Sequence, residues 1–237
     1  MEWQRGMDKA NAAMQATSYV LYDAAGSPAS MRVKMWFFEK RMTFSSYLVN
    51  LGRMEQKSPA YLALNPAGVV PTLCIGQQAI YDSHVILRYL ERRHPSDPRL
   101  MPEGPDAWFE HERWVCLERD LAASMRPAVY ETFAKRRAQA LLAEDPDVGR
   151  KIQAITGEEL FAASFEALCQ SPVDQRLVDT AKVQLRPYLQ HVERVLADGR
   201  EWLLGEALSL ADLSVGPRLA VLPYIDVEVS PAQWPAL

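Results

Sequence analysis

Alternation between short apolar runs and turn-forming residues predicts a mixed order of strands and helices over the first 95 residues. Short β-prone runs predict strands near 18–22, 45–49, 71–75 and 78–81. Longer, mainly apolar stretches predict helices near 29–40 and 83–93, and a short helix is expected near 58–63. The turn signal Gly76-Gln77-Gln78 separates the last two strand runs and indicates a hairpin. The expected order of elements is therefore βαβαββα.

The pattern changes after residues 96–105, which are rich in proline and polar residues and are typical of a linker. Beyond it strand signals largely vanish, and apolar residues from Leu177 to Leu196 recur at helical spacing. Pro187 within that stretch predicts a kink or a break. We therefore predict four parts: an N-terminal extension at 1–17, an α/β domain at 18–95, the linker at 96–105 and an all-helical domain at 106–237.

Composition and charge narrow the range of functions. The chain has 237 residues, 49% of them hydrophobic, so it can bury a substantial core, and a net charge of -4 argues against nucleic-acid binding. Its three cysteines are dispersed without metal or redox spacing, which indicates packed thiols in a reducing compartment. No apolar run reaches the ~18 residues that span a bilayer, and residues 1–17 have no signal-peptide core. We expect a cytoplasmic protein without metal, nucleic-acid or membrane partners.

The segment around Val70 and Pro71 is the strongest candidate for a binding site. A residue before proline favours extended backbone, and Pro71 cannot donate a ladder hydrogen bond, so the pair suits a strand edge. There Val70 could pair its N–H and C=O with an extended peptide. Asp82 and Ser83 follow at the start of a predicted helix, where an N-terminus favours a carboxylate. Taken alone, Val-Pro-Thr-Leu is also a common turn-to-strand sequence.

Four stretches in a fixed order carry a family resemblance. They are Leu-Tyr-x4-Ser-Pro-x-Ser-x-Arg-Val, Leu-Gly-x2-Glu-Gln-Lys-Ser-Pro, Asn-Pro-x-Gly-x-Val-Pro-Thr-Leu and Asp-Ser-x-x-Ile-x-x-Tyr-Leu-Glu. Over residues 18–94 they resemble the thioredoxin-like half of cytosolic glutathione transferases, of the bacterial serine type similar to the theta and zeta classes. Downstream, the run from Trp202 to Leu213 resembles the capping box of a buried helix in the helical half. The region 138–173 most resembles the extended helical half of zeta-like, dehalogenase-like and β-etherase-like members.

The resemblance implies a thioredoxin-like α/β domain followed by an all-α domain, glutathione as co-substrate, a role in detoxification and a homodimer. It places Ser27 where theta and zeta enzymes have the serine that stabilises the glutathione thiolate. A free thiol has a pKa near ~8.5, and lowering it by two units requires about 2.7 kcal/mol of preferential interaction with the anion. The alternative role of Ser27 is an N-cap for the helix beginning near Pro28. Ser30, one helical turn along, is the rival for thiol activation.

The resemblance also assigns the binding residues. Gln56 would hold the glycyl end of glutathione, Asp82 the γ-glutamyl amine and Ser83 the γ-glutamyl carboxylate, while Val70 and Pro71 line the peptide. The alternatives are an exposed helix-start residue for Gln56 and plain helix caps for Asp82 and Ser83. Where many relatives carry Lys or Gln before Val-Pro, this chain has a valine at position 69, for which a basic residue at position 53 or 57 could compensate.

The chain also departs from relatives that react through an enzyme cysteine. It has Ser27 and Ala29 where those relatives place the cysteine, and Cys74 lies on a predicted core strand. What remains is attack by glutathione itself on a small hydrophobic electrophile: conjugation, epoxide opening, ether cleavage or thiol-assisted isomerisation. A non-catalytic scaffold module is the alternative, although the retention of all six site residues argues against it.

Candidates for contact with the electrophile lie in two places. The loop 23–26 is one of them. The other is the first long helix of the second half, with Arg119, Ala123, Met125, Arg126, Tyr130 and Phe133. The two arginines would be informative if buried, since a buried guanidinium needs a partner. His111 is expected on a solvated helix face, between two glutamates. Relatives usually continue beyond Leu237 into a further helix, so either the protein is short at this end or the sequence is truncated. If the helix is absent, we expect a more open electrophile site.

Overall fold

The computed structural model describes residues 19–96, 98–101, 103–158, 161–230 and 232–237, so the predicted extension at 1–17 lies outside the described residues. The chain forms two compact units. Over the described residues, unit 1 comprises the chain from Tyr19 to His94 together with the segment 144–166, and unit 2 comprises the segments 95–143 and 167–237. The sequence range predicted as one helical domain is thus shared between the two units.

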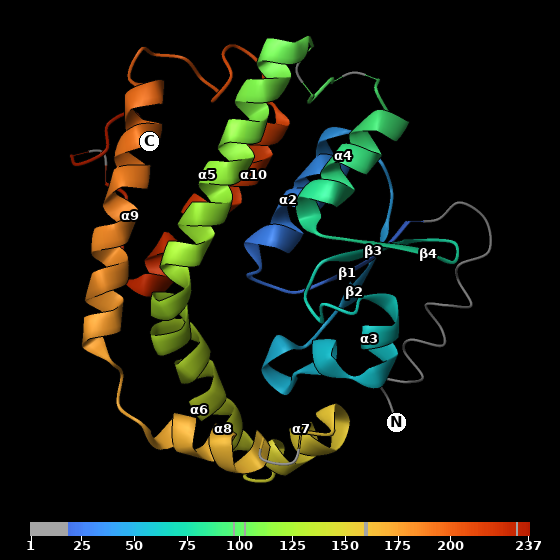
Figure 1. The fold of residues 1–237 in the computed structure, drawn as a ribbon, viewed down its shortest axis with the longest axis vertical. Coiled ribbons are helices and arrows are strands. Elements are labelled where there is room, and N and C mark those ends of the chain that lie inside the picture. Colours follow the sequence, from blue (N-terminus) through green and yellow to red (C-terminus); the bar gives the residue numbers. More distant parts are fainter. Residues whose placement is uncertain (1–18, 97, 102, 159–160, 231) are drawn as a thin grey trace. The chain divides into compact units, whose positions relative to one another are not determined.

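Unit 1 is built on a four-stranded sheet with the order β2-β1-β3-β4 (Figure 1). Strands β1 (Tyr19–Asp23) and β2 (Ser45–Leu48) are parallel, whereas β3 (Thr72–Ile75) and β4 (Gln78–Tyr81) run antiparallel to their neighbours. The intervening helices are α2 (Pro28–Glu39), α3 (Pro59–Leu64) and α4 (Ser83–Arg93), with two 3-10 turns, η1 (Leu51–Arg53) and η2 (Glu55–Lys57). The predicted order βαβαββα is confirmed.

The central strand β1 is buried on both faces, as its continuous apolar run requires. Val20 and Tyr22 point to one face and form a core with Tyr61 of α3 and Cys74 of β3. Tyr19 points to the opposite face, where its ring lies 5.4 Å from that of Phe37 in α2. The sheet therefore separates α3 from the pair α2 and α4 (Figure 1).

Residues 144–166 join unit 1 through the loop before α7 (Val148–Thr156). Asp145 lies 3.7 Å from Arg53 of η1 and 2.7 Å from Lys151, and α7 packs against η2. The Asp145 carboxylate, in the loop before α7, thus links this segment to η1 of the α/β unit. α8 (Phe161–Gln170) follows and crosses from unit 1 into unit 2.

Unit 2 is helical over its described residues. Its elements are α5 (Pro105–Val129), a π-helical turn η3 (Tyr130–Ala134), α6 (Lys135–Glu144), α9 (Gln175–Leu196), α10 (Leu210–Leu219) and a 3-10 turn η4 (Leu222–Ile225). α5 packs on α9 and α10 around a core that includes Leu121, Met125, Leu185 and Leu222. None of the helices in the described part of the chain has both the length and the hydropathy of a transmembrane segment.

Pro187 does not break α9, which runs from Gln175 to Leu196. A proline leaves the carbonyl of the residue four positions earlier without its helical donor. That residue is Val183, whose 73% exposure lets water replace the missing donor, while Leu185 and Leu189 keep the opposite face packed. The alternative of a broken helix is therefore wrong.

The predicted capping box at the start of α10 is confirmed. The Ser209 side chain accepts from the Ala211 amide at 3.2 Å, and Asp212 accepts from the Ser209 amide at 2.9 Å. Asp212 also accepts from the Leu203 amide at 2.7 Å, so it ties the preceding loop to the helix. This satisfies orphan amides at the N-terminus of a buried helix.

Candidate active site

Three segments of unit 1 converge at one end of the sheet. Antiparallel pairing places Tyr22 of β1 opposite Thr72 of β3, and Thr72 opposite Tyr81 of β4. The residues that follow β1, precede β3 and follow β4 therefore meet at this end. They are the loop leading to Ser27, the Val70–Pro71 pair and the Asp82–Ser83 pair.

Ser27 is the N-cap of α2, with extended backbone and Pro28 at the first helical position. Its Oγ accepts from the Ser30 amide at 3.3 Å, and its own amide donates to the Ala24 carbonyl at 3.3 Å. Ser27 is half-buried, and its hydroxyl donates to none of the residues that the structure describes. The cap role is therefore present, and it leaves the hydroxyl proton available.

Ser30 has a different environment. It is fully buried, and its Oγ accepts from the Ala24 amide at 3.2 Å. Through that bond and its own amide, Ser30 fixes both ends of the loop between β1 and α2. The rival for thiol activation is thus a residue that holds Ser27 in place.

The Val70–Pro71 peptide bond is cis, and the backbone before it is fixed by α3. The Val69 carbonyl accepts from the Tyr61 hydroxyl and from Asn65 Nδ2, each at 2.8 Å. In the described part of the chain, the Val70 backbone makes no hydrogen bond with another residue. A fixed edge with a free amide and carbonyl is what β-augmentation by a peptide requires. Nothing in the sequence indicated that Tyr61 would hold the Val69 carbonyl. Asn65 could have been noticed, because it is the first residue of the Asn-Pro motif.

Asp82 and Ser83 form the start of α4. Asp82 is an exposed residue with φ of 65°, and its Oδ1 accepts from the His84 and Val85 amides at 3.0 and 3.1 Å. Ser83 is 7% exposed and is the first residue of the helix. The cap role is therefore present for Asp82 and not for Ser83.

Gln56 is buried at 9% exposure, so the alternative of an exposed helix-start residue is wrong. η2 turns its side chain inward after Met54, which has left-handed backbone. Gln56 Nε2 lies 3.4 Å from the Met54 sulfur, and Oε1 has no hydrogen-bond partner among the described residues. A buried unsatisfied acceptor is rare and costly, so this amide oxygen is suited to a ligand donor.

Of the two residues that could compensate for Val69, Lys57 lies next to it. Lys57 Nζ donates to the Ala67 carbonyl at 3.3 Å, and a Cβ on Gly68 would meet Nζ at 2.8 Å. Arg53 instead pairs with Asp145. The structure therefore places the Lys57 ammonium group beside residues 67 and 68, next to the position where many relatives carry Lys or Gln and this chain has Val69.

Two family models match the chain. The glutathione S-transferase N-terminal domain matches residues 21–99, and the glutathione S-transferase C-terminal domain matches residues 155–237. The chain belongs to the glutathione S-transferase family. Members are enzymes that use glutathione as co-substrate, so the predicted enzyme class and co-substrate are confirmed.

Three relatives illustrate the match. Glutathione S-transferase F10 of Arabidopsis thaliana is 28% identical over 204 residues, covering 86% of the chain and 78% of that relative. Maleylacetoacetate isomerase of Pseudomonas aeruginosa is 40% identical over 88 residues, covering 36% of the chain and 41% of the relative. The structure of beta-etherase LigF from Sphingobium sp. strain SYK-6 has a TM-score of 0.77 at 20% identity, covering 92% of the chain and 91% of that structure, and shows the same fold.

The cysteines of this transferase differ in environment. Burial raises the pKa of the Cys74 thiol to about 11, so Cys74 is a poor nucleophile at neutral pH. Cys169 is also buried, but Cys116 is exposed, which corrects the expectation of three packed thiols. Cys116 lies on α5 beside Trp114 and Val115, and the turn of the helix directs it outward while they are buried.

The electrophile candidates on α5 also separate by burial. Arg119 and Arg126 are exposed, so neither is the buried arginine that would indicate a substrate ligand. Met125 belongs to the hydrophobic core. Tyr130 is 59% exposed in the π-helical turn η3, and Phe133 stacks on Tyr224 with ring centroids 5.0 Å apart. Such π turns are frequent at functional sites.

His111 is buried at 2% exposure, so its expected place on a solvated face is wrong. It shares the buried stripe of α5 with Trp114, Val115 and Glu118, at the i+3, i+4 and i+7 spacing that could have revealed it. The described residues contain no group of three or more acidic, histidine or cysteine side chains placed to hold a metal.

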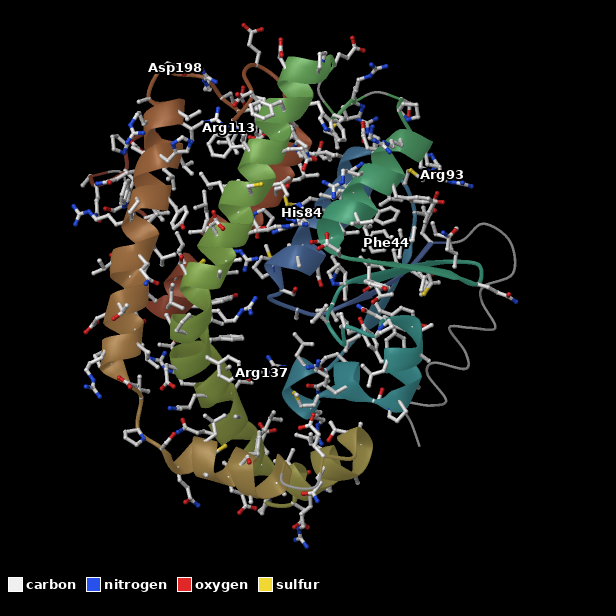
Figure 2. All side chains as sticks on the ribbon, in the orientation of Figure 1. Phe44, His84, Arg93, Arg113, Arg137 and Asp198 are labelled. Carbon is white, nitrogen blue, oxygen red and sulfur yellow. The ribbon has the colours of Figure 1, made fainter. Side chains whose placement is uncertain are left out.

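A buried polar network between α2 and α4 was missed by sequence reasoning. Arg32 Nη1 lies within hydrogen-bond distance of the His84 ring, which Figure 2 labels on α4. Further along α4, Glu91 accepts from Trp36 Nε1 at 2.8 Å and from Lys40 Nζ at 3.0 Å. This network fixes the two helices whose N-termini carry Ser27 and Ser83.

Proposed function

We propose that this glutathione S-transferase binds glutathione along the edge before β3 and activates its thiol at Ser27 for attack on a small hydrophobic electrophile. One observation carries the proposal. The Ser27 hydroxyl accepts from a helix N-terminal amide and keeps its proton for another acceptor at the end of the sheet where three segments converge.

The physical basis is selective stabilisation of an anion. A hydroxyl that donates to a thiolate forms a charge-assisted hydrogen bond, about twice as strong as a neutral one. The Ser30 amide, which donates to Ser27 Oγ, polarises the hydroxyl further. The N-terminus of α2 adds the positive end of the helix dipole. Together these contributions can supply about 2–3 kcal/mol, enough to lower the thiol pKa by about two units.

The peptide is held by complementary groups. The Val70 amide and carbonyl pair with the cysteinyl part of glutathione, while Ser83 binds the γ-glutamyl carboxylate and Asp82 the γ-glutamyl amine. At the other end, the unpaired Gln56 Oε1 accepts from glutathione near its glycyl residue, and Lys57 binds the glycyl carboxylate. Each charged group of the tripeptide then has a partner.

The chemistry that we propose is displacement or addition by the glutathione thiolate, as in conjugation, epoxide opening or ether cleavage. Cys74 is kept protonated by burial, which disfavours a route through an enzyme cysteine on the sheet. Isomerisation, the reaction named for the Pseudomonas aeruginosa relative, would use the same thiolate but return glutathione unchanged. Product analysis separates the two, because only displacement or addition consumes glutathione.

The test is an ultraviolet difference titration of reduced glutathione against pH, which reads thiolate absorbance in the bound state. We expect a bound-thiol pKa well below about 8.5 in the native protein and a return towards that value in Ser27→Ala. Ser58→Ala is the matched control, since Ser58 is also followed by proline and also accepts an amide three residues on at 3.3 Å. An unchanged pKa in Ser27→Ala would refute the activating role of Ser27.

The same titration distinguishes the second function class, a non-catalytic binding or scaffold module. If glutathione does not bind at all, that alternative replaces the proposal. The assembly that we propose by resemblance is a cytoplasmic homodimer engaged in detoxification. Light scattering of the purified chain measures its mass, and a monomer at micromolar concentration would contradict the dimer.

A further inference from the structure

A buried carboxylate lies at the end of β1, directly before the loop that carries Ser27. Asp23 has 0% exposure, although an aspartate is almost never fully buried unless it is paired. Its Oδ2 accepts from Ser46 Oγ at 3.2 Å and forms an ion pair with Lys34 Nζ. Its Oδ1 has no hydrogen-bond partner among the residues that the structure describes. The Asp23 charge therefore depends mainly on Lys34 for its compensation.

Asp23 joins three elements at the base of this loop. It is the last residue of β1, Lys34 lies on α2, and Ser46 lies on β2. The Asp23 carbonyl also accepts from the Val49 amide at 2.7 Å, just beyond the end of β2. The backbone and the side chain of Asp23 thus fix the point from which the loop to Ser27 begins.

The loop between Asp23 and Ser27 is short. The Ser27 amide donates to the Ala24 carbonyl at 3.3 Å, so the chain turns directly after Asp23. Four residues of chain reach at most about 14 Å, which limits the distance between the Asp23 and Ser27 Cα atoms. At about 14 Å and an effective dielectric constant of about 20, one charge changes the pKa of another group by about one unit. An unbalanced Asp23 would therefore oppose a thiolate at Ser27.

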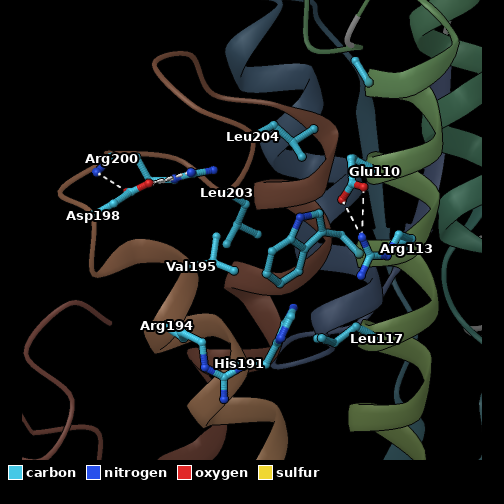
Figure 3. A pocket seen from close by; sticks show the side chains of 12 residues that line it. Glu110, Arg113, Leu117, His191, Arg194, Val195, Asp198, Arg200, Leu203 and Leu204 are labelled. Atoms are coloured by element: carbon cyan, nitrogen blue, oxygen red, sulfur yellow. Dashed lines mark hydrogen bonds and ion pairs between the residues drawn. The ribbon is translucent and has the colours of Figure 1, made fainter.

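The pair differs from the ion pairs that Figure 3 shows on unit 2. There Arg113 pairs with Glu110 and Arg200 with Asp198, and all four side chains are exposed and close in sequence to their partners. Water screens such pairs, and they contribute little. The Asp23 carboxylate is shielded from water by its burial, so its charge acts on its surroundings with less screening.

The Lys34 ammonium is suited to balance this carboxylate. Its side chain is 27% exposed, so the ammonium keeps contact with water. Partial burial lowers the pKa of Lys34 below its usual value, while the adjacent carboxylate favours the charged form. Lys34 can therefore stay charged at neutral pH even where Asp23 is replaced by a neutral residue.

The other buried or half-buried ionisable groups on the neighbouring elements are the same in every variant considered below. On α2 and α4 they are Arg32 with His84, and Lys40 with Glu91. On β2, Tyr47 packs into the core on the opposite face of the sheet, and burial raises the pKa of its hydroxyl. Their contributions cancel when the variants are compared with the native protein.

We propose that Asp23 and Lys34 are positioning residues for the thiolate of bound glutathione, an inference that rests on the proposed role of Ser27. Asp23 holds the start of the Ser27 loop against β2 and α2. Lys34 cancels the negative charge that Asp23 would otherwise set against the thiolate.

The test is the pKa of the bound glutathione thiol, read from thiolate absorbance at saturating glutathione. Asp23→Asn keeps the size of the side chain and leaves Lys34 positive, so it should lower the thiol pKa by about half a unit to one unit. Lys34→Met leaves Asp23 negative and should raise the thiol pKa by about one unit. A general disturbance of the loop would not move the pKa in opposite directions.

Two further variants are the matched controls. Lys34→Arg retains the charge, and the double variant Asp23→Asn/Lys34→Met removes both charges. Each should keep the thiol pKa within about 0.3 unit of the native value. The inference is overturned if Asp23→Asn leaves the thiol pKa unchanged, or if Asp23→Asn and Lys34→Met shift it in the same direction.

The same titration separates this inference from the proposed function. A lowered thiol pKa in the native protein, with no change in Asp23→Asn, would overturn the role of the pair and leave the role of Ser27 intact. A native thiol pKa near about 8.5 would refute activation by Ser27, whereas opposite shifts in the two single variants would still support the pair. Failure of the native protein to bind glutathione would overturn both.

Discussion

Ser27 and Ser58 have almost the same local structure within unit 1. Each is followed by proline at the first helical position, and each accepts the backbone amide three residues on at 3.3 Å. Their surroundings differ, because Ser58 is 3% exposed at the base of α3 whereas Ser27 is half-buried at the end of the sheet. The same Ser-Pro cap can therefore be only a cap at one position and a candidate catalytic group at the other.

The difference between them comes from neighbours distant in sequence. Ser27 follows the central strand, so its loop meets the backbone before β3 and the start of α4. Ser58 follows η2 and begins the short helix that covers the other face of the sheet. A hydroxyl acts on a ligand only where the fold leaves space and a binding edge beside it.

The largest expected effect separates the two serines by activity. Ser27→Ala should lower kcat/KM with a reactive electrophile by about 50-fold near pH 6.5, because about half of the bound thiol is thiolate at a pKa of about 6.5 and only about one hundredth at a pKa of about 8.5. The deficit should shrink as pH rises towards the free thiol pKa, where both proteins hold thiolate. Steady-state kinetics from pH 6 to 9 measure this profile.

Ser58→Ala is the reference for that experiment and should keep kcat/KM within about twofold of the native protein. Equal losses in both variants at every pH would show that the caps act only through folding. Ser27 would then have no catalytic role beyond the capping role that it shares with Ser58.

The next effect concerns Gln56, whose buried Oε1 has no partner among the described residues. Gln56→Met should raise the glutathione Kd by about tenfold, since the ligand loses an acceptor worth about 1–1.5 kcal/mol. The free energy of unfolding without ligand should stay the same or rise, because the unsatisfied group is removed. Calorimetry and urea unfolding measure the two quantities.

An exposed glutamine, Gln78 on β4, gives the control for that change. Gln78→Met should leave the glutathione Kd unaltered. A fall in stability of Gln56→Met with unchanged glutathione affinity would mean that the amide serves the fold alone.

A smaller effect is expected at the glycyl end. Lys57→Met should raise the KM for glutathione by about three- to fivefold, because an exposed ion pair with a carboxylate contributes up to about 1 kcal/mol. Adding Val69→Lys to that variant should restore part of the affinity. Glutathione saturation curves at 50 and 300 mM salt measure both, and a salt-independent KM would contradict a charge contact.

The smallest effect is the difference in stability between the two serine variants. Removing either cap should cost about 1 kcal/mol of unfolding free energy, and the two costs should agree within about 0.5 kcal/mol. Urea unfolding of the ligand-free variants checks this. A much larger cost for Ser27→Ala would indicate that its loop depends on the hydroxyl for more than capping.

Local sequence was sufficient for the order of elements from β1 to α4 because its signals are short-range. Strand and helix periods, the Gly76-Gln77 turn and the Ser-Pro caps each depend on residues within a few positions of one another. The same holds for the capping box at Ser209 and Asp212. The family motifs then added the candidate site residues, since their spacing is fixed along the chain.

Contacts across the fold were decided only by the tertiary structure. Pairing of β1, β3 and β4 brings the three site segments together, and the inward turn of η2 buries Gln56. Packing of α2 on α4 buries Arg32 against His84, which no local pattern signals. The physical reason is that strand register and helix packing are set by partners many residues away, whose identity a local period cannot specify.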